Sequence, residues 1–242
     1  MADDLVTSLI TRGWETGCGQ AASSECIVVS ECVPGGTSTA LGVLSALGVA
    51  ARGLISSSVP QANHDARWQL VEQGLANASR QRRTAALTAV EAIAALGDPM
   101  QAFAAGIACG ATEKGATVIL AGGSQMLAVA ELCRRLLQER GISAPAPVTI
   151  TTRWVAFDRS AGVAKLSAVL DLPFIAGAPD FSRSRHTGLR AYEQQHVKEG
   201  VGAGAAMALA HLVAGRSADE IVQAVDEAYS QLVTANLARE TY

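Results

Sequence analysis

The order of hydrophobic and polar positions along the chain predicts short strands separated by helices. Short runs of aliphatic and β-branched residues, bounded by glycine or polar turns, are typical of strands buried in a sheet. The runs that we assign to strands are residues 26–30, 117–121, 147–152 and 172–176. We expect a further short strand over 51–58, running into a polar serine loop, and we expect 154–158 to continue the 147–152 strand or to pair with it.

Apolar residues between these runs recur at helical spacing. Asp98 is placed to cap a helix that begins with Pro99. The expected helices cover residues 37–48, 60–78, 82–96, 99–114, 124–140, 161–170, 201–214 and 217–236. Strands that alternate with helices predict an α/β fold, a Rossmann-like parallel sheet covered by helices on both faces. We expect a single domain, residues 1–242, in which residues from about 200 to 242 contribute to a small helical lobe.

The composition agrees with one large folded domain. The chain has 242 residues, of which 49% are hydrophobic and 17% charged, enough apolar material for a buried core. Only 4% are aromatic, so the core must consist mainly of alanine, valine, leucine and isoleucine. A net charge of −3 without a basic stripe does not fit a nucleic-acid-binding protein, because such proteins place clustered lysine and arginine against phosphates.

Cysteine usage and the N-terminal sequence indicate the cellular compartment. The five cysteines are irregularly spaced, which is typical of reduced thiols in the cytosol. The acidic start differs from the basic start of a secretory signal peptide, and no apolar run is long enough to span a membrane. The four histidines are scattered and show no metal-ligand spacing. We therefore expect a cytoplasmic protein without membrane association, metal site or cofactor.

Three glycine-containing turns stand where a strand ends or a helix begins. Ligands of open α/β sheets bind at the carboxyl ends of the strands, so these turns are candidate binding loops. In the first turn, Gly35 and Gly36 allow the backbone to approach a ligand closely. Thr37 and Ser38 offer hydroxyl and amide groups at a helix N-terminus, which suits a phosphate. The alternative is an ordinary helix cap that binds nothing.

The second turn, Gly122, Gly123 and Ser124, follows the 117–121 strand. A glycine pair at such a place either contacts a ligand or only permits tight packing between the strand and the next helix. The local sequence leaves both interpretations open.

The third turn, residues 198–204, contains a candidate general base. Glu199 either faces a pocket and accepts a proton or caps the helix that follows. The helix N-terminus and the neighbouring Lys198 both favour the ionised carboxylate, so a working base would need partial burial.

In their order and spacing, the motifs E-C-V-P-G-G-T-S-T-A-L, L-A-G-G-S-Q-M and V-K-E-G-V-G-A-G-A-A resemble the nicotinate-nucleotide–dimethylbenzimidazole phosphoribosyltransferase family, most closely its archaeal and cyanobacterial branch. The resemblance covers residues 17–215. It implies a parallel α/β fold with a smaller helical domain, and a homodimer. The implied reaction moves phosphoribose from nicotinate mononucleotide to a benzimidazole-type base. It gives α-ribazole phosphate and nicotinate, for assembly of the lower ligand of cobalamin.

The resemblance also implies roles for individual residues. Glu199 occupies the position of the family's general base. A basic residue on the helix before Asp98 helps to hold the phosphate in the family, and here it would be Arg82 or Arg83. The residues implied to bind substrate in the three turns are Glu31, Gly35, Gly36, Thr37, Ser38, Gly122, Gly123, Ser124, Lys198, Gly200 and Gly202.

The sequence departs from the family pattern in two places. Family members carry a longer stretch before the first glycine loop, and part of the benzimidazole pocket comes from that stretch. The first loop also differs from the Gly-Asn-Thr-Thr version of the better-known enzymes. The acceptor is therefore open between a benzimidazole, adenine and a phenol. Two alternatives stand beside the transferase: a non-catalytic nucleotide-binding homologue, and an incomplete, N-terminally short enzyme domain.

Overall fold

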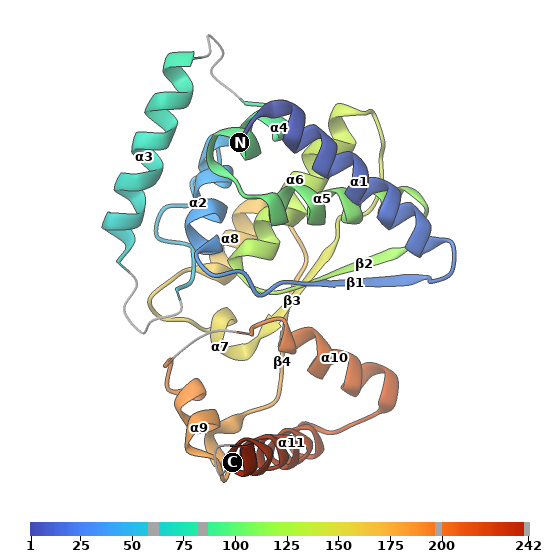
Figure 1. Ribbon diagram of the computed structural model, residues 1–242, viewed down its shortest axis with the longest axis vertical. Coiled ribbons are helices and arrows are strands. Elements are labelled where there is room, and N and C mark those ends of the chain that lie inside the picture. The colour runs from blue at the N-terminus through green and yellow to red at the C-terminus, as the bar shows by residue number, and fades with distance from the viewer. Residues whose placement is uncertain (58–62, 82–86, 197–199, 240–242) are drawn as a thin grey trace.

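The protein, seen in a computed structural model that describes residues 1–57, 63–81, 87–196 and 200–239, is built around a parallel sheet (Figure 1). Within these residues the strands follow chain order across the sheet, β1-β2-β3-β4. All three strand pairings are parallel, which confirms the predicted α/β class. The strands are β1 (Cys26–Ser30), β2 (Thr117–Ala121), β3 (Val148–Thr152) and β4 (Phe174–Gly177).

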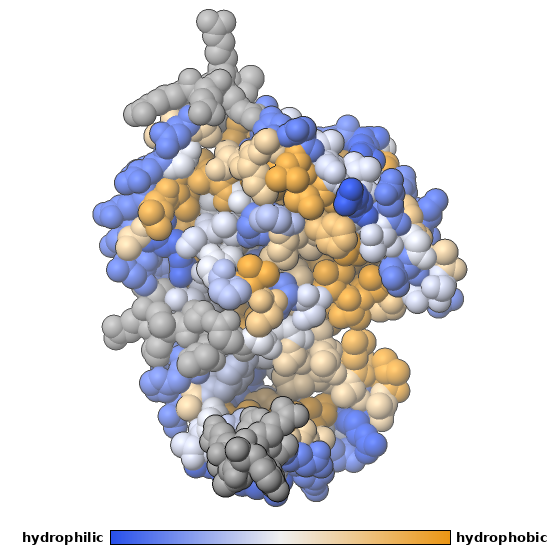
Figure 2. Space-filling view, viewed as in Figure 1, coloured by the Kyte–Doolittle hydropathy of each residue, from blue (hydrophilic) through white to orange (hydrophobic). Residues whose placement is uncertain are grey.

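One face of the sheet carries the larger helical layer and the main core (Figure 1). Leu120 of β2 and Leu127 and Leu132 of α6 are among its fully buried side chains. Another helix, α3 (His64–Gln81), packs outside α2 and α4, and Figure 2 shows mainly hydrophilic residues along its outer side. The helices of the layer are α1 (Asp3–Ala21), α2 (Gly36–Ala46), α4 (Ala89–Leu96), α5 (Pro99–Glu113), α6 (Ser124–Glu139) and α8 (Val163–Leu170).

The opposite face of the sheet is covered by α10 (Ala203–Ala214), which packs on β2, β3 and β4. Phe181, Met207 and Ile221 form a small separate core on this side of the sheet. Helices therefore lie on both faces, as predicted (Figure 1). The remaining elements on this side are α7 (Arg153–Ala156), the short 3₁₀ helix η1 (Phe181–Arg183), α9 (Thr187–Glu193) and α11 (Ala218–Arg239).

Side-chain caps fix where two helices of the larger layer begin. The Asp98 carboxylate accepts a hydrogen bond from the Gln101 backbone N–H at 2.9 Å, and the Gln101 side chain accepts one from Asp98 in return. The predicted cap before Pro99 is therefore confirmed. Thr88 and Glu91 form the same reciprocal arrangement at the start of α4. The helix predicted over 82–96 begins later, at Ala89, and residues 82–86 lie outside the described part of the chain.

Two strand predictions were wrong. Residues 51–57 form turns and loop rather than a strand, because Ile55 is buried by tertiary packing and not by sheet pairing. Residues 153–156 form one helical turn, α7, in which the Phe157 N–H donates to the Arg153 carbonyl oxygen. Both segments contain apolar side chains that are buried, and burial alone does not distinguish a strand from a loop or a short helix.

Helix α1 was not predicted from the sequence. It contains Gly13, Gly17 and Gly19, and glycine has a low helix propensity. Its stability comes from packing on α5, where Val6, Ile10 and Trp14 are buried.

Candidate functional site

A pocket lies at the carboxyl edge of the sheet, where the loops after β1 and β2 meet. It encloses about 540 Å³, counting its solvent-filled mouth. Residues from all three predicted glycine turns line it, together with segments that the sequence did not indicate. The lining residues are 31–35, 37, 56–57, 123–125, 155 and 200–201.

The first turn supplies one wall of the pocket. Glu31 follows β1 directly, is buried, and accepts a hydrogen bond from the Val33 N–H at 2.9 Å. Gly35 has a φ of 79°, a left-handed conformation that favours glycine, and it turns the chain into α2. Gly35 and Thr37 line the pocket.

Two other predicted residues of this turn do not line the pocket. Gly36 packs against the side-chain amide of Gln125, and a Cβ atom there would clash with it. Ser38 follows Thr37 in α2, and its N–H donates to the Gly35 carbonyl oxygen.

The second turn lies beside the first. Gly123 and Ser124 line the pocket, and α6 begins at Ser124. Gly122 lies just behind, where a Cβ atom would come within 3.3 Å of the Glu31 carboxylate. The buried Ser124 hydroxyl accepts a hydrogen bond from the Ser56 N–H at 2.9 Å.

The third turn reaches the same pocket from the other face of the sheet. Gly200 lines it together with Val201. Gly202 packs closely against Ser30 and Ala121, the last residues of β1 and β2, and does not line the pocket. The other predicted residues, Lys198 and Glu199 here and Arg82 and Arg83 elsewhere, lie outside the described residues.

The helices that start at the pocket differ from α4 and α5 in how they begin. Among the described residues, no side chain caps the N-terminus of α2 or α6, and neither helix has an acidic residue in its first turn. Uncapped N–H groups and the positive end of the helix dipole form a favourable environment for an anion. The termini of α2 and α6, together with the turn before α10, make this pocket suited to a phosphate group.

Several lining residues were missed by sequence reasoning. Ser56 and Ser57 come from the loop that was predicted to be a strand, and their serine-rich sequence was the only available signal. Gln125 belongs to the second motif but was not assigned a role, although its buried side-chain oxygen has no hydrogen-bond partner among the described residues. Val155 lies on α7.

The end of β3 near this pocket is held by α9. The Tyr192 hydroxyl donates to the Thr152 hydroxyl oxygen at 2.9 Å, and the Trp154 indole N–H donates to the Tyr192 carbonyl oxygen at 2.7 Å. Burial raises the pKa of the Tyr192 phenol, so this hydroxyl keeps its proton and remains a donor. Burial also raises the pKa of the neighbouring Glu193 carboxyl.

The described residues hold neither a metal cluster nor a helix suited to a bilayer. Within the described ranges, no group of three or more histidine, cysteine, aspartate or glutamate side chains is placed to hold a metal ion. Among the helices of the same residues, none combines the length and the apolar character needed to cross a membrane.

The chain is a parallel α/β protein with glycine-containing loops around a pocket at the carboxyl edge of its sheet, and a solved structure shares its fold. The structure of CobT from Thermus thermophilus matches with a TM-score of 0.58 at 17% identity, covering 92% of this chain and 58% of that chain. No protein-family model matches the sequence.

Other relatives share a higher sequence identity with this chain than CobT does. The chain is 44% identical over 230 residues to a UPF0284 protein of Gloeobacter violaceus, covering 94% of this chain and 60% of the relative. A UPF0284 protein of Thermosynechococcus vestitus is 40% identical over 228 residues, with 93% and 60% covered. The chain thus spans about three-fifths of the length of these relatives. Its close homologues are UPF0284 proteins and its fold is that of CobT, which confirms the family resemblance stated from the three motifs.

Proposed function

We propose that this chain transfers phosphoribose from nicotinate mononucleotide to a benzimidazole-type base, giving α-ribazole phosphate and nicotinate. The observation that carries the proposal is that the N-termini of α2 and α6 meet the turn before α10 at one pocket on the carboxyl edge of the sheet. A mononucleotide has a phosphate monoester that such termini attract. The motifs that supply these two termini and the turn before α10 are those on which the family resemblance rests.

The proposed reaction needs a phosphate-binding site and one general base from the protein. The phosphate sits against the termini of α2 and α6, which orients the ribose. The bond between C1′ and the pyridinium nitrogen breaks, and nicotinate leaves with the bonding electrons. The imine nitrogen of the benzimidazole forms the new bond to C1′. The proton on the other ring nitrogen of the benzimidazole passes to Glu199. Glu199 precedes Gly200, which lines the pocket, and its role is part of the proposal.

A non-catalytic nucleotide-binding homologue, or an incomplete enzyme domain, is the second candidate. The UPF0284 relatives carry no named activity, so this candidate stands beside the transferase. A homodimer and a cytoplasmic location stay predictions of the sequence and of the resemblance.

The test is a turnover assay with nicotinate mononucleotide and dimethylbenzimidazole, in which nicotinate and α-ribazole phosphate are separated by chromatography. We expect both products from the wild-type chain in equal amounts. Glu199→Gln should bind nicotinate mononucleotide but react about 10²–10⁴-fold more slowly, because the acceptor proton has no base to receive it. Glu227→Gln, on the exposed surface of α11, is the matched control and should react like wild type.

The outcomes separate the two candidates. Binding of nicotinate mononucleotide without product for any benzimidazole, adenine or phenol would favour the non-catalytic or incomplete domain. Full activity of Glu199→Gln would remove Glu199 from the role of base.

A further inference from the structure

The wall of the pocket formed by Ser56 and Ser57 is held by a buried polar network. The Ser56 hydroxyl donates to one carboxylate oxygen of Asp158 at 2.7 Å. The other carboxylate oxygen of Asp158 accepts from the N–H and the hydroxyl of Ser160 at 2.8 and 2.7 Å. Asp158 is 5% exposed, so its charge is compensated by these hydrogen bonds and not by bulk water.

A cation holds the same segment from the side of α3. The Arg67 guanidinium donates to the carbonyl oxygens of Ile55 and Ser56 at 3.4 and 3.3 Å. Burial lowers the pKa of Arg67 from its usual value, yet an arginine remains charged at neutral pH. Ser56 is therefore held at two points, by its side-chain hydroxyl on Asp158 and by its backbone carbonyl oxygen on Arg67.

The fixed Ser56 backbone in turn determines the direction of the Ser124 hydroxyl. Ser124 is 2% exposed, and its oxygen accepts the Ser56 N–H at 2.9 Å. A serine hydroxyl has one hydrogen to donate, and within the described part of the chain that hydrogen has no acceptor. Ser124 is the first residue of α6 and lines the pocket, so the hydrogen is available beside an uncapped helix terminus.

We propose that Asp158 is a positioning residue of the pocket: acting through Ser56, it fixes the Ser124 hydroxyl so that this group donates its hydrogen to a phosphate monoester bound at the N-terminus of α6. The inference rests on the proposed function for the identity of the nucleotide. The network from Asp158 to Ser124 is a property of the fold. Asp158 acts only through Ser56, and Ser124 is the group that touches the ligand.

The experiment is a double-mutant cycle measured by isothermal titration on the full chain, with nicotinate mononucleotide and inorganic phosphate as the two probes. Ser124→Ala should weaken both probes by about 10- to 100-fold, the range for a hydrogen bond to a charged group. Ser56→Ala should weaken the binding of both probes by a smaller factor, because the residue 56 N–H and the Arg67 contact remain while the hydrogen bond to Asp158 is lost. The double variant should bind no more weakly than Ser124→Ala alone, because Ser56 acts only through Ser124.

Matched variants separate positioning from folding. Ser56→Thr keeps a hydroxyl for Asp158 and should bind like wild type. Ser160→Ala removes a hydroxyl from the far oxygen of Asp158 and should leave binding unchanged. Asp158→Ala should follow Ser56→Ala, and if Asp158→Ala fails to fold, the two serine variants still decide the matter.

The outcomes distinguish this inference from the proposed function. Additive effects of Ser56→Ala and Ser124→Ala, or wild-type binding by Ser124→Ala, would overturn the inference even if turnover is observed. The predicted coupling with inorganic phosphate, in a chain that never releases nicotinate, would support the inference while the proposed function fails. A wild-type chain that binds neither probe would overturn both.

Discussion

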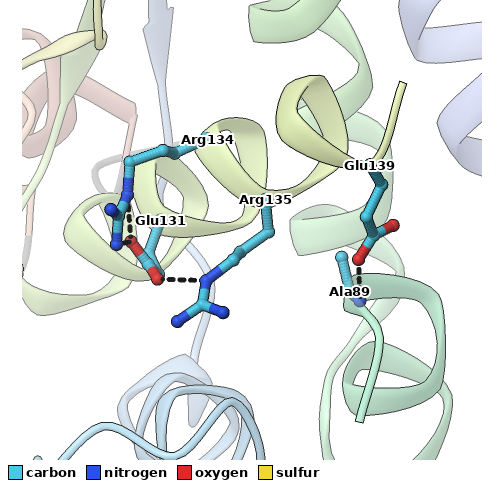
Figure 3. A network of polar contacts seen from close by, with 5 residues as sticks. All are labelled: Ala89, Glu131, Arg134, Arg135 and Glu139. Carbon is cyan, nitrogen blue, oxygen red and sulfur yellow. Dashed lines mark hydrogen bonds and ion pairs between the residues drawn. The ribbon is translucent and has the colours of Figure 1, made fainter. Parts of the chain in front are cut away.

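Glu131 is a charged residue that is fully buried on α6, and its charge is balanced by two arginines of the same helix. Arg134 donates through Nε to one carboxylate oxygen at 2.8 Å, and Arg135 donates through Nε to the other, also at 2.8 Å (Figure 3). Figure 3 also shows Glu139, further along α6, which accepts the Ala89 N–H at 3.0 Å and so ties α6 to the start of α4. A buried carboxylate is tolerated only while such partners remain.

Removal of both arginines should therefore cost more than the two single changes together. We expect Arg134→Met or Arg135→Met alone to lower the free energy of unfolding by about 1 kcal/mol, because one partner remains. The double variant should lose about 3–5 kcal/mol, the cost of an uncompensated buried charge. Urea denaturation followed by circular dichroism measures these values. Addition of Glu131→Leu to the double variant should restore most of the loss, and a double variant that merely equals the sum of the single changes would contradict this explanation.

At the scale of elements, α1 and α5 approach each other through glycines on both helices. Gly13 and Gly17 of α1 lie against the backbone of α5, and Gly106 and Gly110 of α5 lie against the backbone of α1. A Cβ atom on any of the four would clash with a carbonyl oxygen of the other helix. Close backbone contact of this kind is possible only without side chains at the contact points.

Gly17→Ala should lower the free energy of unfolding by about 1–3 kcal/mol, the usual cost of overpacking. Gly19→Ala in the same helix is the control, because a Cβ atom there meets nothing within 4 Å. The control should leave stability unchanged or raise it by up to about 1 kcal/mol through helix propensity. Thermal unfolding compares the two variants, and equal destabilisation by both would show that the contact is not the cause.

The success of sequence reasoning also differs between elements. The strands β1 and β2 were predicted with their observed bounds, because short β-branched runs between turns have few alternatives. Helix α1 was missed because glycines lower helix propensity locally. Two of its glycines allow close contact with α5, a partner far away in the sequence. Residues 51–58 were predicted to form a strand from their short apolar run, but the described residues 51–57 form a loop in which Ile55 is buried by the core and Ser56 and Ser57 line the pocket.

In the pocket, too, residues within local motifs were predicted and residues that meet through long-range contacts were not. Gly35, Thr37, Gly123, Ser124 and Gly200 line it and had been singled out from local motifs. The serine-rich sequence was the only local signal for the Ser56–Ser57 wall, because the contact of Ser56 with Ser124 joins residues 68 positions apart. Glu199, Lys198 and the two arginines at 82 and 83 stay predictions, because they lie outside the described residues.

At the scale of the whole molecule, the pocket depends on both helical layers. Helices α2 and α6 begin at it on one face of the sheet, and the turn before α10 reaches it from the other, so the three segments meet at the shared strand edge (Figure 1). The fold of CobT has the same arrangement of sheet and helices, and the UPF0284 relatives extend beyond the part that this chain covers. The proposed function requires that this edge binds a mononucleotide through its phosphate.

The most direct test of that claim is isothermal titration of the wild-type chain with nicotinate mononucleotide and with nicotinate riboside, which differ only in the phosphate. We predict that the mononucleotide binds and that the riboside binds at least about 10-fold more weakly, because it has no phosphate for the termini of α2 and α6. Equal affinity for the two ligands, or binding of the riboside alone, would contradict the account.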